Sequence, residues 1–143
     1  MNPNTLPDLS GFRHHTDLQI RFSDVDVLGH VNNTVYMAFY DTGKAHFSRE
    51  ILGQPVDWRH VETVIANVDC AFIAPVYFGE EIEVLTKCSS ISEKSFKLLQ
   101  VIRSKEGEVK SACETVMVAF DLKSAKAMEL PDVWRDALER SLR

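Results

Sequence analysis

Two spacings of apolar residues divide the chain into strands and helices. Between residues 15 and 22 polar and apolar residues alternate, with Leu18, Ile20 and Phe22 on one side, which predicts a half-buried strand. From residue 33 to residue 51 the spacing changes to steps of three and four, which predicts a helix with an aromatic face. The residues on this face are Tyr36, Phe39, Tyr40, Gly43 and Phe47.

The predicted helix has start and stop signals at its two ends. Asn32 or Asn33 suits the N-cap position, because a short side chain there accepts a hydrogen bond from a free N–H group of the first turn. Gly53, followed two residues later by Pro55, ends the helical region.

Four more strands and one short helix are predicted after the long helix. The strands span residues 62–73, 81–89, 95–104 and 109–122. In the first of these strands, five alternate residues are expected on one face: Val64, Ala66, Val68, Cys70 and Phe72. Pro75 and Gly79 mark one turn, and residues 105–108 form a hairpin turn.

The two ends of the chain differ in pattern. Residues 131–143 place apolar residues among charges and predict a short amphipathic C-terminal helix. Residues 1–12 contain Pro3, Pro7 and Gly11 with little periodicity, and we expect a loose N-terminal arm there.

The order of elements predicts an α+β fold in one domain, residues 1–143. Short connections favour antiparallel neighbours, so the strands form a five-stranded antiparallel sheet, and the long helix covers one of its faces. A sheet this small has exposed edges, and edge-to-edge pairing of two copies would cover them. We therefore expect a homodimer.

Composition agrees with a globular domain and narrows the classes of partner. The 143 residues are 45% hydrophobic and 26% charged, which excludes predominant disorder, and the length suits a single core. No segment approaches the roughly 18 apolar residues of a membrane helix. The formal net charge of −5 disfavours binding to nucleic acids or anionic membranes. The first 15 residues lack the apolar segment of a secretory signal, so a cytoplasmic location is expected.

The cysteines and histidines form no recognisable metal or redox motif. Cys70, Cys88 and Cys113 are far apart and odd in number, which is typical of reduced thiols in core or sheet positions. None of the histidines forms an HxxxH or HExxH motif, so no metal is expected. The histidines are His14, His15, His30, His46 and His60. The GxSxG, GxGxxG and Walker motifs are also absent from the sequence.

The densest group of polar residues lies between the first strand and the helix. Residues 21–36 read RFSDVDVLGHVNNTVY and include Asp24 and Asp26. A helix start offers free N–H groups and a positive dipole end, which hold an oxyanion or a carbonyl oxygen. A carboxylate beside such donors suits acyl transfer or hydrolysis. The same residue types also serve in loops and caps for conformational reasons alone, so both interpretations stay open at this point.

Residues 24–36, followed by Tyr40, resemble the signature of hotdog-fold acyl-CoA thioesterases of the 4-hydroxybenzoyl-CoA thioesterase type. Weaker similarities at Asn67, at Pro75 with Gly79 and at residues 94–96 extend the resemblance over roughly residues 14–122. It implies a curved sheet wrapped around a central helix and hydrolysis of an acyl-CoA. It also implies no cofactor, since coenzyme A is part of the substrate, and a homodimer or tetramer with active sites at the subunit interface.

The resemblance assigns roles to individual residues. Asp26 matches the catalytic nucleophile or general base, and Asn33 lies where a backbone N–H polarises the thioester carbonyl. Gly29 permits close approach of the acyl group, and His30 orients the loop or the substrate. The residues expected to bind substrate are Tyr36, Asn67, Lys94 and Ser95.

The sequence departs from the family pattern in two places. Asp41 stands where relatives often carry glutamate, and Ser92 and Glu93 precede Lys94 where relatives can carry arginines, which weakens the case for phosphate binding there. Two other functions on the same fold stay open. One is a non-catalytic acyl-CoA binding protein, and the other is a dehydratase that uses His30.

Overall fold

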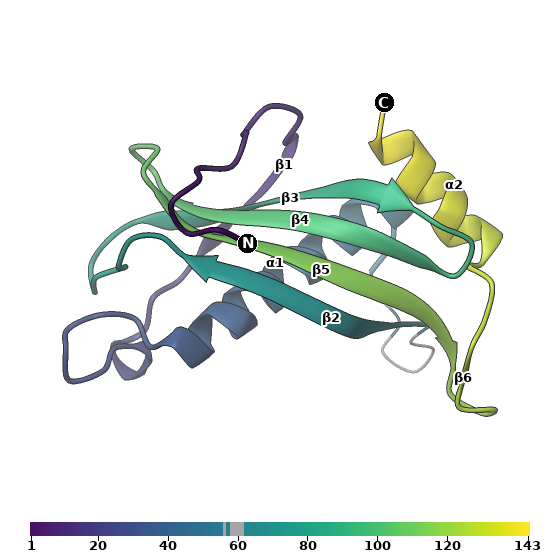
Figure 1. Cartoon of the computed structure of the whole chain (residues 1–143), viewed down its shortest axis with the longest axis horizontal. Helices are drawn as coiled ribbons and strands as arrows, with labels where there is room; N and C mark the ends of the chain where they lie inside the picture. Colours follow the sequence, from purple (N-terminus) through teal and green to yellow (C-terminus); the bar gives the residue numbers. More distant parts are fainter. Residues whose placement is uncertain (56, 58–61) are drawn as a thin grey trace.

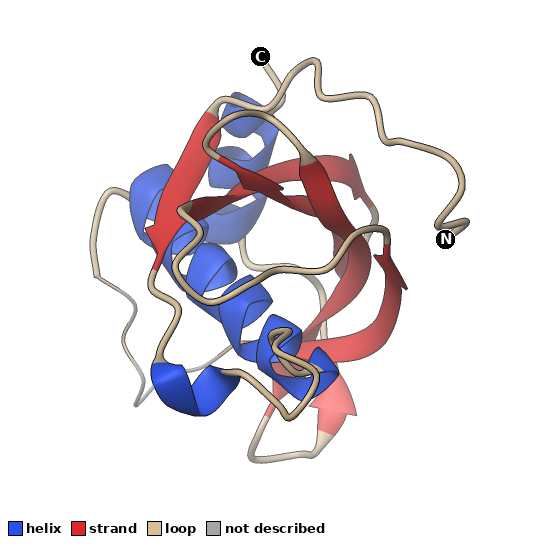
Figure 2. Ribbon diagram, turned by 90° about the vertical axis from the view of Figure 1, so that its left-hand side faces the viewer, coloured by secondary structure: helices blue, strands red, loops and turns tan. Residues whose placement is uncertain are grey.

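The computed structural model describes residues 1–55, 57 and 62–143, and it contains a curved antiparallel sheet around one long helix (Figures 1 and 2). The five main strands lie in the order β1-β3-β4-β5-β2, and all neighbours are antiparallel, as predicted. They are β1 (His14–Leu18), β2 (Thr63–Phe72), β3 (Ile82–Ile91), β4 (Ser95–Ser104) and β5 (Val109–Asp121). A sixth strand, β6 (Lys126–Ala127), pairs with the end of β5. The prediction missed β6 because two exposed residues show no alternation.

The long helix α1 (Asn33–Leu52) forms where predicted, and both of its ends are capped locally. The Asn32 side chain accepts a hydrogen bond from the Thr34 N–H, and Gly53 adopts a left-handed conformation with φ of 71°. A Cβ on Gly43 would lie 2.8 Å from Nε2 of Gln100 and 2.9 Å from Cγ1 of Val84. The missing side chain at this position therefore lets α1 approach the sheet closely.

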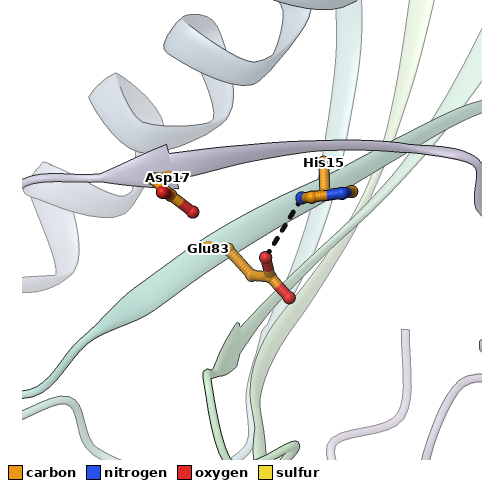
Figure 3. Close-up of side chains that lie close together, drawn as sticks. All are labelled: His15, Asp17 and Glu83. Atoms are coloured by element: carbon orange, nitrogen blue, oxygen red, sulfur yellow. Dashed lines mark ion pairs between the residues drawn. The ribbon is translucent and has the colours of Figure 1, made fainter.

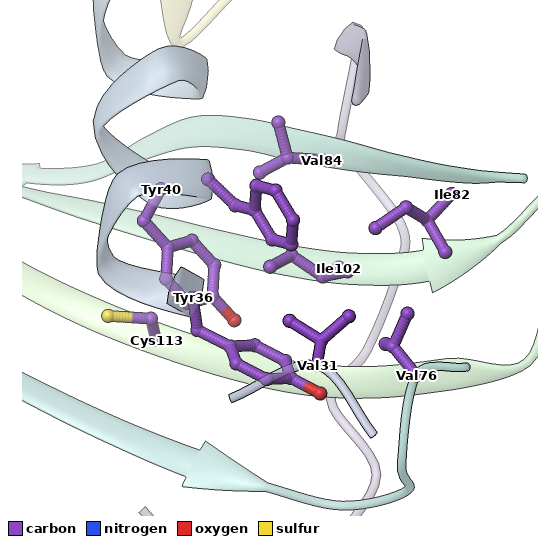
Figure 4. Close-up of a cluster of buried hydrophobic side chains, with 9 residues drawn as sticks. Val31, Tyr36, Tyr40, Val76, Ile82, Val84, Ile102 and Cys113 are labelled. Carbon is purple, nitrogen blue, oxygen red and sulfur yellow. The ribbon is translucent and has the colours of Figure 1, made fainter. Parts of the chain in front are cut away.

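The main core lies between α1 and the inner face of the sheet (Figure 4). Tyr36 and Tyr40 of the helix meet valine and isoleucine side chains of β3 and β4 there. The Tyr40 hydroxyl donates a hydrogen bond to Oγ of Ser111, and that hydroxyl donates to the carbonyl of Ala71. This network satisfies the buried hydroxyls of Tyr40 and Ser111 and links α1 to β5 and β2.

The first strand is shorter than predicted. β1 ends at Leu18, and residues Phe22–Asp24 form a short 3-10 helix, η1. The side chain of Phe22 is consequently 82% exposed instead of facing the core. The Asp24 carboxylate accepts a hydrogen bond from the Arg21 N–H, and this local bond overrides the alternating pattern.

A β-bulge at Ala66 changes which residues of β2 share a face. The register of β2 against β5 shifts between Ile65 and Asn67. Ile65 therefore lies on the face of Val68, Cys70 and Phe72, where the prediction placed Val64 and Ala66. Sequence alternation alone does not reveal one inserted residue.

The two ends of the chain pack against different parts of the sheet. Helix α2 (Asp132–Ser141) forms within the predicted range and stacks Trp134 on Phe96. The N-terminal arm forms no helix or strand, and part of it contacts the sheet. Leu9 and Phe12 pack on the sheet face opposite α1, and the terminal amino group pairs with Asp69 at 2.6 Å. Within the described residues, no helix is long and apolar enough to cross a membrane.

Candidate active site

A cavity of about 390 Å³ opens at the N-terminus of α1. Its lining comes from the loop that precedes the helix, from the first turn of α1, and from the end of β2 with the residues after it. Its lining residues are Asp26, Leu28, His30, Val31, Asn32, Asn33, Tyr36, Phe72, Ile73, Ala74 and Pro75. The polar group predicted from residues 24–36 and the helix start therefore meet at one cavity.

The two aspartates of the loop have different environments. Asp24 is only 4% exposed. Its carboxylate accepts a hydrogen bond from the Arg21 N–H, and its backbone carbonyl accepts one from the Asn32 N–H. Asp26 lines the cavity, and its Oδ1 accepts a hydrogen bond from the Leu28 N–H at 2.9 Å. Its Oδ2 accepts no hydrogen bond within the part of the chain that the structure describes. Asp24 thus holds the loop, whereas Asp26 lines the cavity with a carboxylate that the described residues bond through one oxygen only.

Gly29 allows the loop to turn back between Asp26 and His30. The Gly29 N–H donates to the carbonyl of Asp26 at 3.0 Å, and the Asp26 N–H donates to the carbonyl of His30 at 2.9 Å. Gly29 has a φ of 81°, a conformation that other residues rarely adopt. A Cβ there would meet nothing within 4 Å, so the glycine is required by the backbone conformation and not by crowding within this chain.

We expect Gly29→Ala to lower the free energy of unfolding by about 1 kcal/mol, because alanine is strained in the left-handed conformation. Urea unfolding monitored by circular dichroism measures this change. Gly29→Asn is the matched control and should lose less, since asparagine tolerates positive φ better. Equal stability of wild type and Gly29→Ala would show that the loop does not need the turn at this residue.

The first turn of α1 and the loop before it supply further polar groups to the cavity. Asn33 begins the helix, so its backbone N–H has no carbonyl partner within the helix. His30 stands edge-on to the ring of Tyr77 with centroids 5.0 Å apart, which fixes its place at the cavity. Tyr36 packs edge-on against Phe72 with ring centroids 5.0 Å apart, and burial raises the pKa of its phenol.

Sequence reasoning did not assign the wall formed by residues 72–75 to the site. The N–H groups of Ile73 and Ala74 both donate to the carbonyl of Lys110, and Nζ of Lys110 donates to the carbonyl of Pro75 at 3.1 Å. Burial disfavours the Lys110 charge, but ion pairs with Glu80 at 3.1 Å and Glu108 at 3.2 Å outweigh it and raise its pKa. Lys110 therefore holds this wall with both its backbone and its side chain.

Three of the predicted binding residues lie away from the cavity in a single chain. Ser95 pairs with Val118 of β5, whereas Phe72 of the cavity pairs with Ser111 of the same strand. Val118 and Ser111 are seven positions apart, which is roughly 23 Å along the strand at about 3.3 Å per residue. Lys94 precedes Ser95 in the turn at that far end. Asn67 is exposed on the face of β2 opposite to Phe72. Their roles in binding stay predictions.

A comparison with protein families identifies the chain. The model of the family described as "Thioesterase-like superfamily" matches residues 20–138, which includes the whole cavity. The protein belongs to the thioesterase-like superfamily. The curved sheet around a central helix is the hotdog fold of its structural neighbours, and it confirms the predicted fold.

Named relatives of this thioesterase-like protein match most of its length. The long-chain acyl-CoA thioesterase FadM of Escherichia coli strain K12 is 26% identical over 90% of this chain and 98% of its own. The acyl-CoA thioester hydrolase YbgC of Escherichia coli O157:H7 is 24% identical over 80% of this chain and 87% of its own. A thioesterase from Thermus thermophilus, solved with coenzyme A and Zn, superimposes with a TM-score of 0.82 at 22% identity. That alignment covers 94% of this chain and 97% of the Thermus chain.

His15, Asp17 and Glu83 of the thioesterase-like protein come together on strands β1 and β3 (Figure 3). Their potential ligand atoms lie within 4.8 Å of one another, a juxtaposition that the sequence did not indicate. Lys105 pairs with both carboxylates, however, and Nε of Arg103 donates to Glu83 at 2.9 Å. These two cations already neutralise the carboxylates, so we interpret the cluster as an ion-pair network that joins β1, β3 and β4.

Proposed function

We propose that this protein hydrolyses the thioester of an acyl-CoA to the free acid and coenzyme A. One observation carries the proposal, namely that Asp26, whose Oδ2 accepts no hydrogen bond from the described residues, and Asn33 at the N-terminus of α1 line the same cavity. The activities named for FadM and YbgC support the same substrate class.

Each group has a role in this reaction. Asp26 either removes a proton from the attacking water or attacks the thioester carbon itself, forming an anhydride that water then hydrolyses. The Asn33 N–H stabilises the negative oxygen of the tetrahedral intermediate, helped by the positive end of the α1 dipole. The thiolate of coenzyme A leaves without a strong general acid, because a free thiol has a pKa of about 8.5. The reaction needs no cofactor of the protein's own.

Strand β2 provides the edge for the proposed homodimer. In the described residues β2 pairs only with β5, and its apolar side chains Ile65, Val68 and Phe72 are exposed. Antiparallel pairing of two β2 edges would bring the Phe72 end of one copy beside the Thr63 end of the other. Lys94 and Ser95 lie at that second end, because Ser95 and Val64 both pair with Val118. Each cavity would thus lie at the subunit interface, near these two residues of the partner.

The hydrogen-bond pattern of β2 allows a test of this edge. The Ile73 N–H donates to the carbonyl of Lys110 on β5. Along an antiparallel strand, successive N–H groups point alternately to the two neighbouring sides. The Asp69 N–H therefore points to β5, and the Val68 N–H points to the free edge. We expect Val68→Pro to give a folded monomer, measured by light scattering. Asp69→Pro removes a bond to β5 and should destabilise the fold by about 1 kcal/mol or more. A monomeric wild type, or a dimeric Val68→Pro, would contradict edge pairing.

A panel of acyl-CoAs tests the proposed reaction. Acyl-CoAs with short, long and aromatic acyl groups are each incubated with the protein. Release of the free thiol of coenzyme A is followed with a chromogenic disulfide. We expect turnover of at least one acyl class. Tight binding without thiol release would instead indicate a non-catalytic acyl-CoA binding protein, and hydration of an enoyl-CoA that depends on His30 would indicate a dehydratase.

A further inference from the structure

Two of the three cysteines face each other across neighbouring strands. Cys70 of β2 is the direct partner of Cys113 of β5. Because the Ile73 N–H donates to the carbonyl of Lys110, the alternation along the ladder makes Cys70 and Cys113 a non-hydrogen-bonded pair. In such pairs the two Cα atoms are about 4.5 Å apart and the side chains are at their closest.

This arrangement meets the geometric requirement of a disulfide. Bridged cysteines have Cα atoms about 4.4–6.8 Å apart, so these two can be joined with little movement of the backbone. Both side chains point to the α1 side of the sheet, where Cys113 belongs to the main core and Cys70 packs beside it. Both are free thiols in this structure.

The two thiols differ in a way that assigns their order of reaction. Cys113 is completely buried, whereas Cys70 is only half-buried on the edge strand. Hydrogen bonding to Cys113 lowers the pKa of Cys70 to about 7, against the effect of burial and with help from Ser111. Cys70 therefore carries thiolate at neutral pH and is the more accessible nucleophile.

Cys88 provides an internal comparison within the same sheet. It lies on β3, where burial raises the pKa of its thiol to about 11, and its Sγ donates to the carbonyl of Ser90. Its direct partner on β4 is Leu98, so Cys88 has no thiol opposite it on that strand. Cys88 should therefore react slowly with peroxide. Oxidation of Cys70 and Cys113 without oxidation of Cys88 would indicate a specific reaction.

We propose that Cys70 and Cys113 form a reversible disulfide when the protein meets a peroxide. The Cys70 thiolate attacks hydrogen peroxide, the O–O bond breaks, and Cys70 becomes a sulfenic acid with release of hydroxide. The Cys113 sulfur then attacks the Cys70 sulfur, the S–O bond breaks, and the second hydroxide leaves with the Cys113 proton as water. Two thiols are oxidised, one peroxide is reduced to water, and a dithiol reverses the reaction. The bridge would tie β2 to β5 two residues from Phe72 of the cavity.

Mass spectrometry of the folded, full-length protein tests this proposal without any assay of hydrolysis. The result is therefore independent of whether the proposed function is correct. Reduced protein is treated with hydrogen peroxide, unfolded, and alkylated. We expect loss of two hydrogen atoms, one alkylated cysteine in place of three, and a peptide pair linked through Cys70 and Cys113. Dithiothreitol should restore three alkylated cysteines.

Single variants identify the thiols that react. Cys88→Ser is the matched control and should form the bridge as the wild type does. Cys70→Ser should react more slowly with peroxide at its remaining thiols, and Cys113→Ser should stop at the sulfenic acid of Cys70, which dimedone traps. Oxidation of the wild type to a sulfinic acid with no linked peptide, or only disulfides between chains, would overturn the proposal. The wild-type peptide map decides the question even if a variant fails to fold.

Discussion

Replacing Asp26 with asparagine should lower kcat for acyl-CoA hydrolysis by about two to four orders of magnitude and change KM only slightly. Asparagine keeps a carbonyl oxygen that can accept the Leu28 N–H, so the loop should retain its shape. It cannot take a proton from water or attack the thioester as a carboxylate does. Initial rates of thiol release across substrate concentrations measure both constants.

Asp24→Asn is the matched control for this experiment, because Asp24 lies two residues away and is buried in contact with Arg21. We expect it to lower the stability of the fold, since the neutral amide gives up the ion pair with Arg21 and the charge-assisted hydrogen bond from the Arg21 N–H, while the folded fraction keeps most of its turnover. Full activity in Asp26→Asn would remove Asp26 from the reaction. Equal losses of turnover in both variants would point to the loop rather than to one carboxylate.

Lys110→Met should lower the free energy of unfolding by about 3 kcal/mol, because it leaves Glu80 without its buried cationic partner. The same change removes the hydrogen bond to the carbonyl of Pro75, so the wall of the cavity loosens. We therefore also expect a several-fold higher KM for acyl-CoA in the folded fraction. Urea unfolding and steady-state kinetics measure the two effects.

Glu108→Gln is the control for Lys110, since it weakens an ion pair whose carboxylate is 62% exposed. Its effect on stability should stay below about 1 kcal/mol, as for other exposed pairs. A Lys110→Met variant as stable as Glu108→Gln would show that the buried lysine does not support the wall. A large loss of stability with unchanged KM would confine Lys110 to the fold.

The elements that sequence reasoning placed well are those determined by neighbouring residues. The bounds of α1 follow from the Asn32 cap, the spacing of its aromatic residues and the turn at Gly53, all of which act within a few positions. The end of β1 and the bulge at Ala66 were missed. In each case one hydrogen bond or one inserted residue changed the face of a strand without changing its composition.

In the candidate site, too, local sequence predicted some features and the tertiary structure decided the others. Residues 24–36 predicted a carboxylate beside a helix start, and the structure places Asp26 and Asn33 at one cavity. The sequence did not separate Asp24 from Asp26, because their difference lies in burial and hydrogen bonding. The separation of Lys94 and Ser95 from the cavity likewise depends on strand order and register, which pattern along the chain does not specify.

By itself, the sequence determined the helix, the antiparallel strands, the fold class and the motif of the candidate site, because short-range spacing and capping encode them. Only the tertiary structure decided which aspartate faces the cavity, that Lys110 supports the wall after β2, and that Cys70 lies opposite Cys113. The contact of Lys110 with Pro75 and the pairing of Cys70 with Cys113 join residues far apart in the chain, and the two aspartates differ in burial. Burial and distant contacts arise from strand register and packing, which local patterns do not carry.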